Sequence, residues 1–131
     1  MPKVFTSKTQ KIGELGEDLA CRFLMKHGFA IMERNYTKKW GEIDIVAEKG
    51  WKTYFVEVKS KMADLEAIKD IDGYRPEENM HPWKLQRLSR VVQTYLSEHE
   101  SMGDWQFDLL VVFIDSENKK VKVRRMENIV L

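Results

Sequence analysis

Three charged residues, Asp44, Glu57 and Lys59, stand within two otherwise apolar stretches of the sequence, GEIDIVAE and KTYFVEVKS. Burying such charges is costly unless a partner or a function compensates. Side chains alternate along a strand, so Glu57 and Lys59 lie on the same face of the second stretch. If the two stretches form a hairpin with an even number of loop residues, such as Lys49-Gly50, Asp44 shares that face.

Two carboxylates that lie so close together repel each other, and one of them would take up a proton in the absence of a cation. A hard divalent cation such as Mg²⁺ removes this conflict, because it prefers oxygen ligands and keeps several waters for a substrate. A lysine beside such a metal can orient a water molecule and neutralise charge that develops on a phosphate. Asp44, Glu57 and Lys59 together therefore predict hydrolysis of a phosphodiester bond.

The alternative is that Glu57 and Lys59 form a solvated ion pair, which is the commoner role of an E-x-K triplet and contributes less than ~1 kcal/mol. Two features of the sequence favour a functional site. Apolar residues flank the triplet on both sides in YFVEVKS, and Asp44 has equally apolar neighbours. Charges in a strand that is covered on both faces need a partner.

The elements that would position these residues begin with a helix over residues 8–27. Its apolar residues recur at three- and four-residue steps, and Gly28 follows as a C-terminal cap. On this helix Glu17 lies at the margin of the buried stripe and can reach the sheet, whereas Glu14 faces solvent. Glu17 is therefore a further candidate for the site; the alternative is a surface carboxylate paired with a basic residue of the same helix.

Strand patterns follow the helix, first in FAIMERNY and then in the hairpin of GEIDIVAE and KTYFVEVKS. Residues 61–81 lack periodicity and are expected to form a long mobile connection with a short helix over residues 62–68. A second amphipathic helix is predicted from Pro82 to about Glu98. WQFDLLVVFI is typical of a central strand, and KKVKVRR of an edge strand. We expect a single α/β domain over residues 1–131, with a mixed sheet of four or five strands flanked by helices.

Composition and charge narrow the class of protein. The 131 residues are 43% hydrophobic, with no secretory leader and no apolar run of membrane-spanning length, so we expect a soluble cytoplasmic protein without a membrane partner. Cys21 is the single cysteine and is expected to be a buried, reduced thiol. Residues 41–82 carry 6 basic and 10 acidic groups, whereas residues 1–40 carry 8 and 4. A metal site beside surfaces that hold a polyanion has this pattern, as does an acidic loop among solvated lysines.

Basic and aromatic residues near the second helix are candidates for contact with nucleic acid. Lys84 and Arg87 flank the apolar stripe of that helix near its N-terminus, where phosphates bind well, although solvated positions are the commoner role. Trp40, Trp51 and Trp83 lie beside predicted turns, where exposed rings could stack on unpaired bases. Packing is the commoner role of a tryptophan.

Four blocks of the sequence resemble the successive blocks of the YraN family of bacterial endonuclease-like proteins. That family is related to archaeal Holliday-junction resolvases within the PD-(D/E)XK nuclease superfamily. The four blocks are GELGEDLACRFLMKHGFAIMERNY, GEIDIVAEKGWKTYFVEVKSK, HPWKLQRLSRVVQTYL and FDLLVVFI. The resemblance extends over most of the chain.

The resemblance implies a restriction-endonuclease-like αβββαβ core and a role for each matched residue. Asp44 would be the aspartate of the PD half-motif, Glu57 and Lys59 would form the E-x-K half, and Glu17 would be the helix acid of the resolvase branch. Asp44, Glu57 and the Val58 carbonyl would bind Mg²⁺ or Mn²⁺. Lys59 would position the attacking water, and Glu17 would support a second metal or a water.

The resulting hypothesis is a metal-dependent endonuclease that cleaves DNA, with branched or structured DNA as the implied substrate. Relatives of this type act as two-fold dimers, so a homodimer is implied as well. Lys61 stands where relatives commonly have an arginine, and it joins Lys84 and Arg87 as a candidate contact to nucleic acid. The alternative is a nucleic-acid-binding or scaffolding module with little or no catalytic activity, although intact acidic and lysine positions speak against it.

Overall fold

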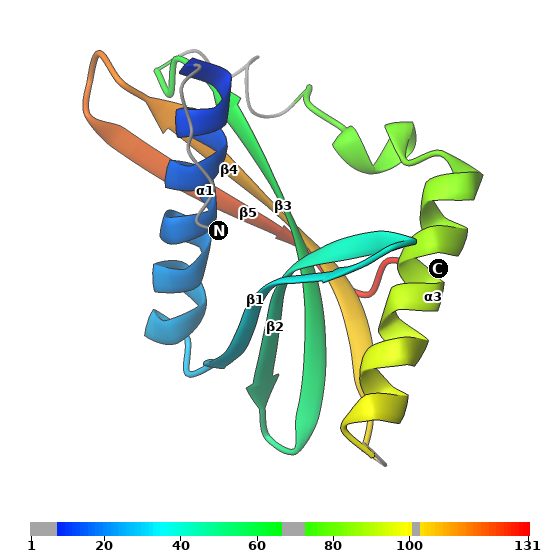
Figure 1. Cartoon of the computed structure of the whole chain (residues 1–131). Helices are drawn as coiled ribbons and strands as arrows, with labels where there is room; N and C mark the ends of the chain where they lie inside the picture. The colour runs from blue at the N-terminus through cyan, green and yellow to red at the C-terminus, as the bar shows by residue number, and fades with distance from the viewer. Residues whose placement is uncertain (1–7, 67–72, 101–102) are drawn as a thin grey trace.

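The computed structural model describes residues 8–66, 73–100 and 103–131. Most of this part of the chain is helix or strand (Figure 1). The elements in chain order are α1 (Lys8–Lys26), β1 (Ala30–Lys38), β2 (Gly41–Lys49), β3 (Lys52–Met62), the 3₁₀ helix η1 (Pro76–Asn79), α3 (Pro82–Glu98), β4 (Trp105–Asp115) and β5 (Lys120–Met126). The predicted order of helices and strands is confirmed. None of the described helices is long and apolar enough to cross a membrane.

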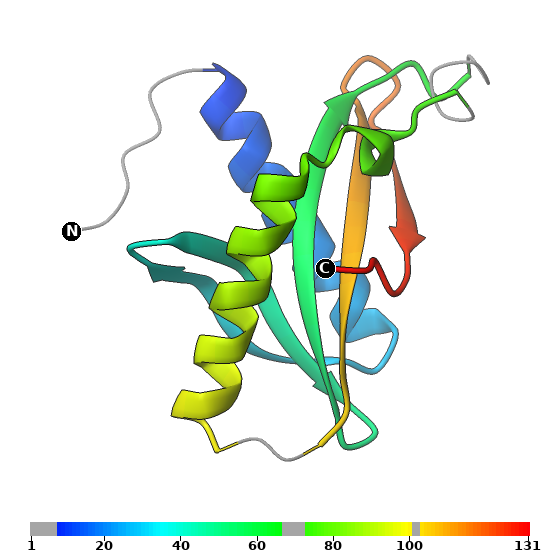
Figure 2. The same cartoon turned by 90° about the vertical axis from the view of Figure 1, so that its right-hand side faces the viewer.

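The five strands form one mixed sheet in the order β1-β2-β3-β4-β5. Neighbouring strands are antiparallel except β3 and β4, which are parallel. A parallel pair needs a crossover connection, and α3 lies in the segment that joins β3 to β4. Helix α1 covers one face of the sheet and α3 the other (Figures 1 and 2). The predicted α/β class is confirmed, and the arrangement is consistent with a restriction-endonuclease-like core.

The two larger of three apolar clusters among the described residues lie on opposite faces of the sheet. The core under α1 contains buried residues from α1, β2, β3 and β4, and Cys21 is among them, as predicted. The core under α3 contains buried residues from β1, β2, β3, α3 and β4. Residues 106–115 of β4 are buried throughout, because both faces of that strand are covered. The stretch WQFDLLVVFI, whose Gln106 and Asp108 are buried as well, was therefore interpreted correctly as a central strand.

Strand β2 pairs with β3 along only part of its length. Their register runs from Lys49 opposite Lys52 to Ile45 opposite Val56, around a two-residue turn at Gly50-Trp51. Both turn residues have positive φ, as a tight hairpin turn requires. The predicted turn at Lys49-Gly50 was one residue too early, but its even length was correct.

On the N-terminal side of Ile45, β2 is separated from β3 and pairs with β1 alone. The first residues of β2 pair only with β1, and Figure 1 shows this end of the β1–β2 hairpin reaching toward α3. Ile43 packs in the core under α3, whereas Ile45, two residues later, packs under α1. Asn35 in β1, with a φ of +53°, lies at the same level. The face of the sheet to which these side chains point therefore changes at Asp44, where β2 separates from β3.

The connection between β3 and α3 differs from the prediction at both ends. Lys61 and Met62 belong to β3, so the expected connection over 61–81 begins two residues later. Residues 62–66 are not helical, and the last two residues of the helix expected over 62–68 lie outside the described residues. The 3₁₀ helix Pro76–Asn79 was not predicted. The expected mobility also concerns residues 67–72, which lie outside the described ranges.

Gly16 lets α1 lie directly against β3. A Cβ atom at this buried position would lie 1.7 Å from Ser60 Oγ and 2.9 Å from Ser60 Cβ. A larger residue here would force Ser60 or the helix to shift. This close approach also fixes the height of Glu17, the next residue, above the sheet.

We predict that Gly16→Ala destabilises the protein by about 1–3 kcal/mol, because overpacking outweighs the better helix propensity of alanine. Gly13→Ala is the matched control in the same helix, since a Cβ there meets nothing within 4 Å. That change should stabilise the protein by roughly 0.5–1 kcal/mol. Urea unfolding of both variants measures the difference. Equal stabilisation by both changes would contradict the close approach of α1 to β3.

Candidate metal centre

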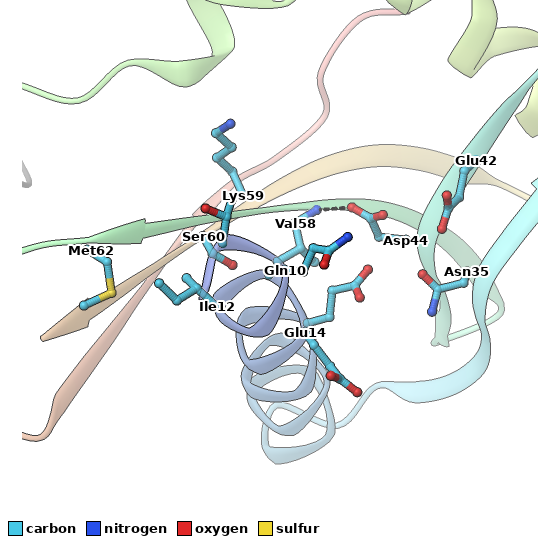
Figure 3. Close-up of a pocket in the computed structure, with 13 residues that line it drawn as sticks. Gln10, Ile12, Glu14, Asn35, Glu42, Asp44, Val58, Lys59, Ser60 and Met62 are labelled. Carbon is cyan, nitrogen blue, oxygen red and sulfur yellow. Dashed lines mark hydrogen bonds between the residues drawn. The ribbon is translucent and has the colours of Figure 1, made fainter. Parts of the chain in front are cut away.

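A cavity of about 570 Å³ opens between the first half of α1 and strands β1, β2 and β3 (Figure 3). Its lining includes four of the residues predicted for the site, Glu17, Asp44, Val58 and Lys59. It lies where β2 leaves β3, so the separation of the strands supplies the space. The sequence placed these residues on separate elements, and the fold brings them to one cavity.

Asp44 is tied to the edge of β3 that β2 leaves exposed. The backbone N–H of Val58 donates to Asp44 Oδ2 at 2.8 Å, as Figure 3 shows. An N–H without a ladder partner must find another acceptor, and the Asp44 carboxylate provides it. The contact that the structure gives between Asp44 and Val58 is thus to the amide, whereas the Val58 carbonyl was the atom predicted as a metal ligand.

The environment of Asp44 favours the protonated acid. Burial is the main cause, and it raises the pKa of Asp44 to about 7, although the hydrogen bond from Val58 acts in the opposite direction. Three neighbouring carboxylates, those of Glu57, Glu17 and Glu42, contribute to the same rise in pKa. A cluster of carboxylates that disfavours ionisation of its central member is the electrostatic setting that a divalent cation would relieve.

Glu57 lies on the other side of the strand separation. Its Oε1 forms an ion pair with Lys84 Nζ of α3 at 3.0 Å. Its Oε2 is buried and has no hydrogen-bond partner among the described residues. The carboxylate lines two smaller cavities, of about 210 and 300 Å³, which face η1 and α3. Asp44 and Glu57 are therefore electrostatic neighbours whose carboxylates open onto different cavities.

Lys59 is placed between these cavities. It contributes to the lining of both the large cavity and the 210 Å³ cavity. In Figure 3 its side chain extends away from Val58 and Ser60, to the opposite side of β3. Among the described residues, no ion pair joins Lys59 to Asp44 or Glu57. Its ammonium would have to swing toward the carboxylates to take the predicted part in chemistry.

The helix acid takes the predicted position. Glu17 is partly buried, lines the large cavity and acts on the pKa of Asp44. Glu14 is exposed, but it also borders the cavity, so it lies nearer to the site than the prediction that it faces solvent implied. The Asn35 amide, oriented so that its nitrogen donates, bonds Glu42 Oε1 at 2.8 Å and Glu17 Oε1 at 3.3 Å.

Sequence reasoning missed Asn35 and Glu42 as parts of this site. Glu42 lies two residues before Asp44 in β2, and this spacing was the one available signal for it. Asn35 is in β1, and its role depends on a positive φ that local pattern does not predict. The ion pair of Lys84 with Glu57 was also missed, because it joins elements far apart in the chain.

The three residues predicted to contact nucleic acid lie near the Glu57 side. Lys84 binds Glu57, as described above. Arg87, one turn later in α3, donates from Nε to the Trp40 carbonyl at 2.9 Å and lies over the Trp83 ring at 5.5 Å. Lys61 Nζ lies 4.3 Å from the centroid of a tyrosine ring. These contacts within the protein do not test whether the three residues bind nucleic acid.

The donor set suits a hard divalent cation. Carboxylates are the ligands that Mg²⁺ and Mn²⁺ prefer, and the buried, unpartnered Oε2 of Glu57 is an oxygen that lacks a positive partner. In the arrangement described, no three Asp, Glu, His or Cys side chains converge as a complete metal site. A cation held by Asp44 and Glu57 would thus take its remaining ligands from backbone, water and substrate, as Mg²⁺ often does.

Comparison with known proteins gives matches over most of the chain. The model of a family described as "Uncharacterised protein family UPF0102" matches residues 16–112, a range that includes Glu17, Asp44, Glu57 and Lys59. A UPF0102 protein of Campylobacter lari is 35% identical over 117 residues, 89% of this chain and 91% of the relative. One of Campylobacter concisus is 38% identical over 106 residues, 80% and 86% of the two chains. One of Caldicellulosiruptor bescii is 31% identical over 121 residues, 91% and 96% of the two chains.

We predict that metal-free wild type loses stability relative to Asp44→Asn as the pH rises from about 4 to about 7. Folding raises the pKa of Asp44 from 3.8 to about 7, so in this range the folded protein holds a proton that the unfolded chain releases. The asparagine keeps an acceptor for Val58 N–H and carries no charge. Above pH 7 the variant should be the more stable, by an amount on the order of a few kcal/mol.

Urea unfolding in the presence of a chelator, at several pH values, measures this difference. Glu14→Gln is the control, because it removes an exposed carboxylate from the rim of the same cavity. Parallel stability curves for wild type and Asp44→Asn across this pH range would show that Asp44 is not perturbed by its site.

Proposed function

The chain belongs to the family UPF0102, to which the resemblance to YraN proteins pointed, and we propose that it is a metal-dependent endonuclease that hydrolyses phosphodiester bonds in DNA. The observation that carries the proposal is the strand separation at Asp44. It places the carboxylates of Asp44 and Glu17 on one cavity, and Glu57, which opens onto the neighbouring cavities, lies close enough to raise the pKa of Asp44. Burial at this point disfavours the negative charge of Asp44. Carboxylates kept in such a place are better explained by a cation than by stability.

Asp44 and Glu57 would hold Mg²⁺ or Mn²⁺, with Val58 supplying a backbone oxygen. The cation would lower the pKa of a water molecule and neutralise charge on the phosphate. Asp44 is fixed by its hydrogen bond with Val58, so its carboxylate is already oriented in the protein without substrate. Orientation of this kind reduces the entropy lost when the reacting groups meet.

Lys59 and Glu17 would act on the reacting groups from opposite sides of the opening. The Lys59 ammonium, once turned toward Glu57, would orient the attacking water and stabilise the charge that grows on the phosphate. Glu17 would accept a hydrogen bond from a water in the large cavity, where its carboxylate is held beside the Asn35 amide. The roles are distinct: Lys59 stabilises negative charge, and Glu17 positions a proton donor.

DNA is the proposed partner, and the protein is proposed to act on it in the cytoplasm. Lys61, Lys84 and Arg87 would contact phosphates on the side of β3 where Glu57 lies. Cleavage of both strands of a symmetric branch needs two sites related by two-fold symmetry, so we propose a homodimer on such a substrate. The modest net charge of +1 predicts weak binding to unbranched duplex DNA.

Lys59→Ala is predicted to abolish metal-dependent cleavage while leaving the affinities for DNA and metal largely intact. The lysine acts mainly on charge that appears in the transition state, so its loss lowers turnover much more than affinity. Single-turnover cleavage of branched and linear DNA at saturating protein, with Mg²⁺ and with Mn²⁺, measures the effect.

Arg87→Gln is the matched control, because it removes a cation that contacts the Trp40 carbonyl and lies outside the proposed reaction centre. That variant should bind DNA less tightly and keep its turnover at saturation. Wild-type rates from Lys59→Ala would exclude its catalytic role. No cleavage of any substrate by wild type would favour a nucleic-acid-binding module instead.

A further inference from the structure

The 300 Å³ cavity between α3 and the separated end of β2 combines an aromatic ring, two cations and a proposed metal ligand. Glu57 contributes to one side of it, and Trp83 and Arg87 of α3 contribute to another. Gly41 and Glu42 of β2 and Lys84 and Leu88 of α3 complete the lining. This volume lies at the lower end of the range for small-molecule pockets, about 300–1,000 Å³. The cavity thus adjoins the proposed reaction centre and has room for a group of modest size.

Trp83 differs from the other tryptophans in its surroundings. Trp105 packs edge-on against Phe55. The Trp40 ring lies 4.3 Å from the Arg90 guanidinium, much as the Trp83 ring lies 5.5 Å from that of Arg87, but Trp40 lines none of the cavities described here. Trp51 is 92% exposed at the β2–β3 turn and lines none of the cavities described here. Trp83 is 53% exposed and borders a cavity. An indole left half-open beside a cavity is suited to stacking against a planar ligand.

We propose that this cavity is a subsite for an unpaired nucleotide of single-stranded DNA, whose base stacks on Trp83 and whose phosphate contacts Lys84 and Arg87. The proposal rests on the proposed function, because Glu57 in the same cavity would place that nucleotide beside the scissile bond. A base within a continuous duplex is stacked on its neighbours and is not available to Trp83. The substrate class is therefore DNA with a single-stranded segment at a branch or end.

The charges around the cavity set how such a ligand binds. The carboxylates of Glu42 and Glu57 balance the cations of Lys84 and Arg87, so net charge attracts a polyanion little. Stacking must supply most of the affinity, which predicts a shallow dependence on salt. A phosphate would also compete with Glu57 for Lys84, since those two groups form an ion pair at 3.0 Å.

The test measures binding of labelled oligothymidylate and of a blunt duplex to the full-length protein in EDTA, so that no cleavage is required. Trp83→Ala should weaken single-strand binding about tenfold, because the base loses the ring on which it stacks, and should leave duplex binding unchanged. Trp83→Phe should keep most of the affinity but lose the quenching of indole fluorescence by the oligonucleotide. Trp51→Asn is the control, since it removes an exposed indole from a turn position with a φ of +67°, which asparagine tolerates.

Wild-type affinity in Trp83→Ala, an equal loss for single strand and duplex, or an equal loss in Trp51→Asn would each overturn the proposal. The result is independent of catalysis. Cleavage by wild type without Trp83-dependent binding would leave the nuclease in place and remove the subsite. Trp83-dependent binding without any cleavage would leave the subsite and remove the nuclease.

Discussion

The separation of β2 from β3 at Asp44 is the constraint on which the rest of the structure depends. The last paired residues are Ile45 of β2 and Val56 of β3. The part of β2 that precedes Ile45 is separated from β3 and packs in the core under α3. The separation leaves Val58 N–H without a ladder partner, and Asp44 accepts its hydrogen bond. In this position the Asp44 carboxylate is buried and loses contact with water, and this burial raises its pKa although the hydrogen bond from Val58 opposes the rise.

The candidate site receives residues from the helices on both faces of the sheet, because the strands separate there. On one side, the close packing of Gly16 against Ser60 holds α1 near the sheet, so that Glu17 lines the cavity. On the other, α3 brings Lys84 to Glu57. The protein without ligands thus holds one carboxylate partly by protonation and the other by an ammonium, and both arrangements would give way to a divalent cation. Affinity for the metal should for this reason depend on pH.

Sequence patterns were sufficient for the order of the main helices and strands, because that order depends on local periodicity. The alternation in YFVEVKS placed Glu57 and Lys59 on one face, and the helical phase placed Glu17 nearer the sheet than Glu14. What the patterns could not contain is the point at which β2 leaves β3. Their prediction of one shared face assumed regular pairing past Ile45, whereas Asp44 and Glu57 open onto different cavities. The ion pair of Lys84 depends on tertiary packing alone.

The central claim is that Asp44 and Glu57 together bind a divalent cation. Calorimetric titration of Mn²⁺ into the protein without DNA, at pH 8 where Asp44 is ionised, tests it most directly. The account predicts a saturable site in wild type, and a loss of affinity of about tenfold or more in both Asp44→Asn and Glu57→Gln. Glu14→Gln should bind as wild type does. Equal Mn²⁺ affinity in all four proteins, or no binding in any of them, would contradict the account.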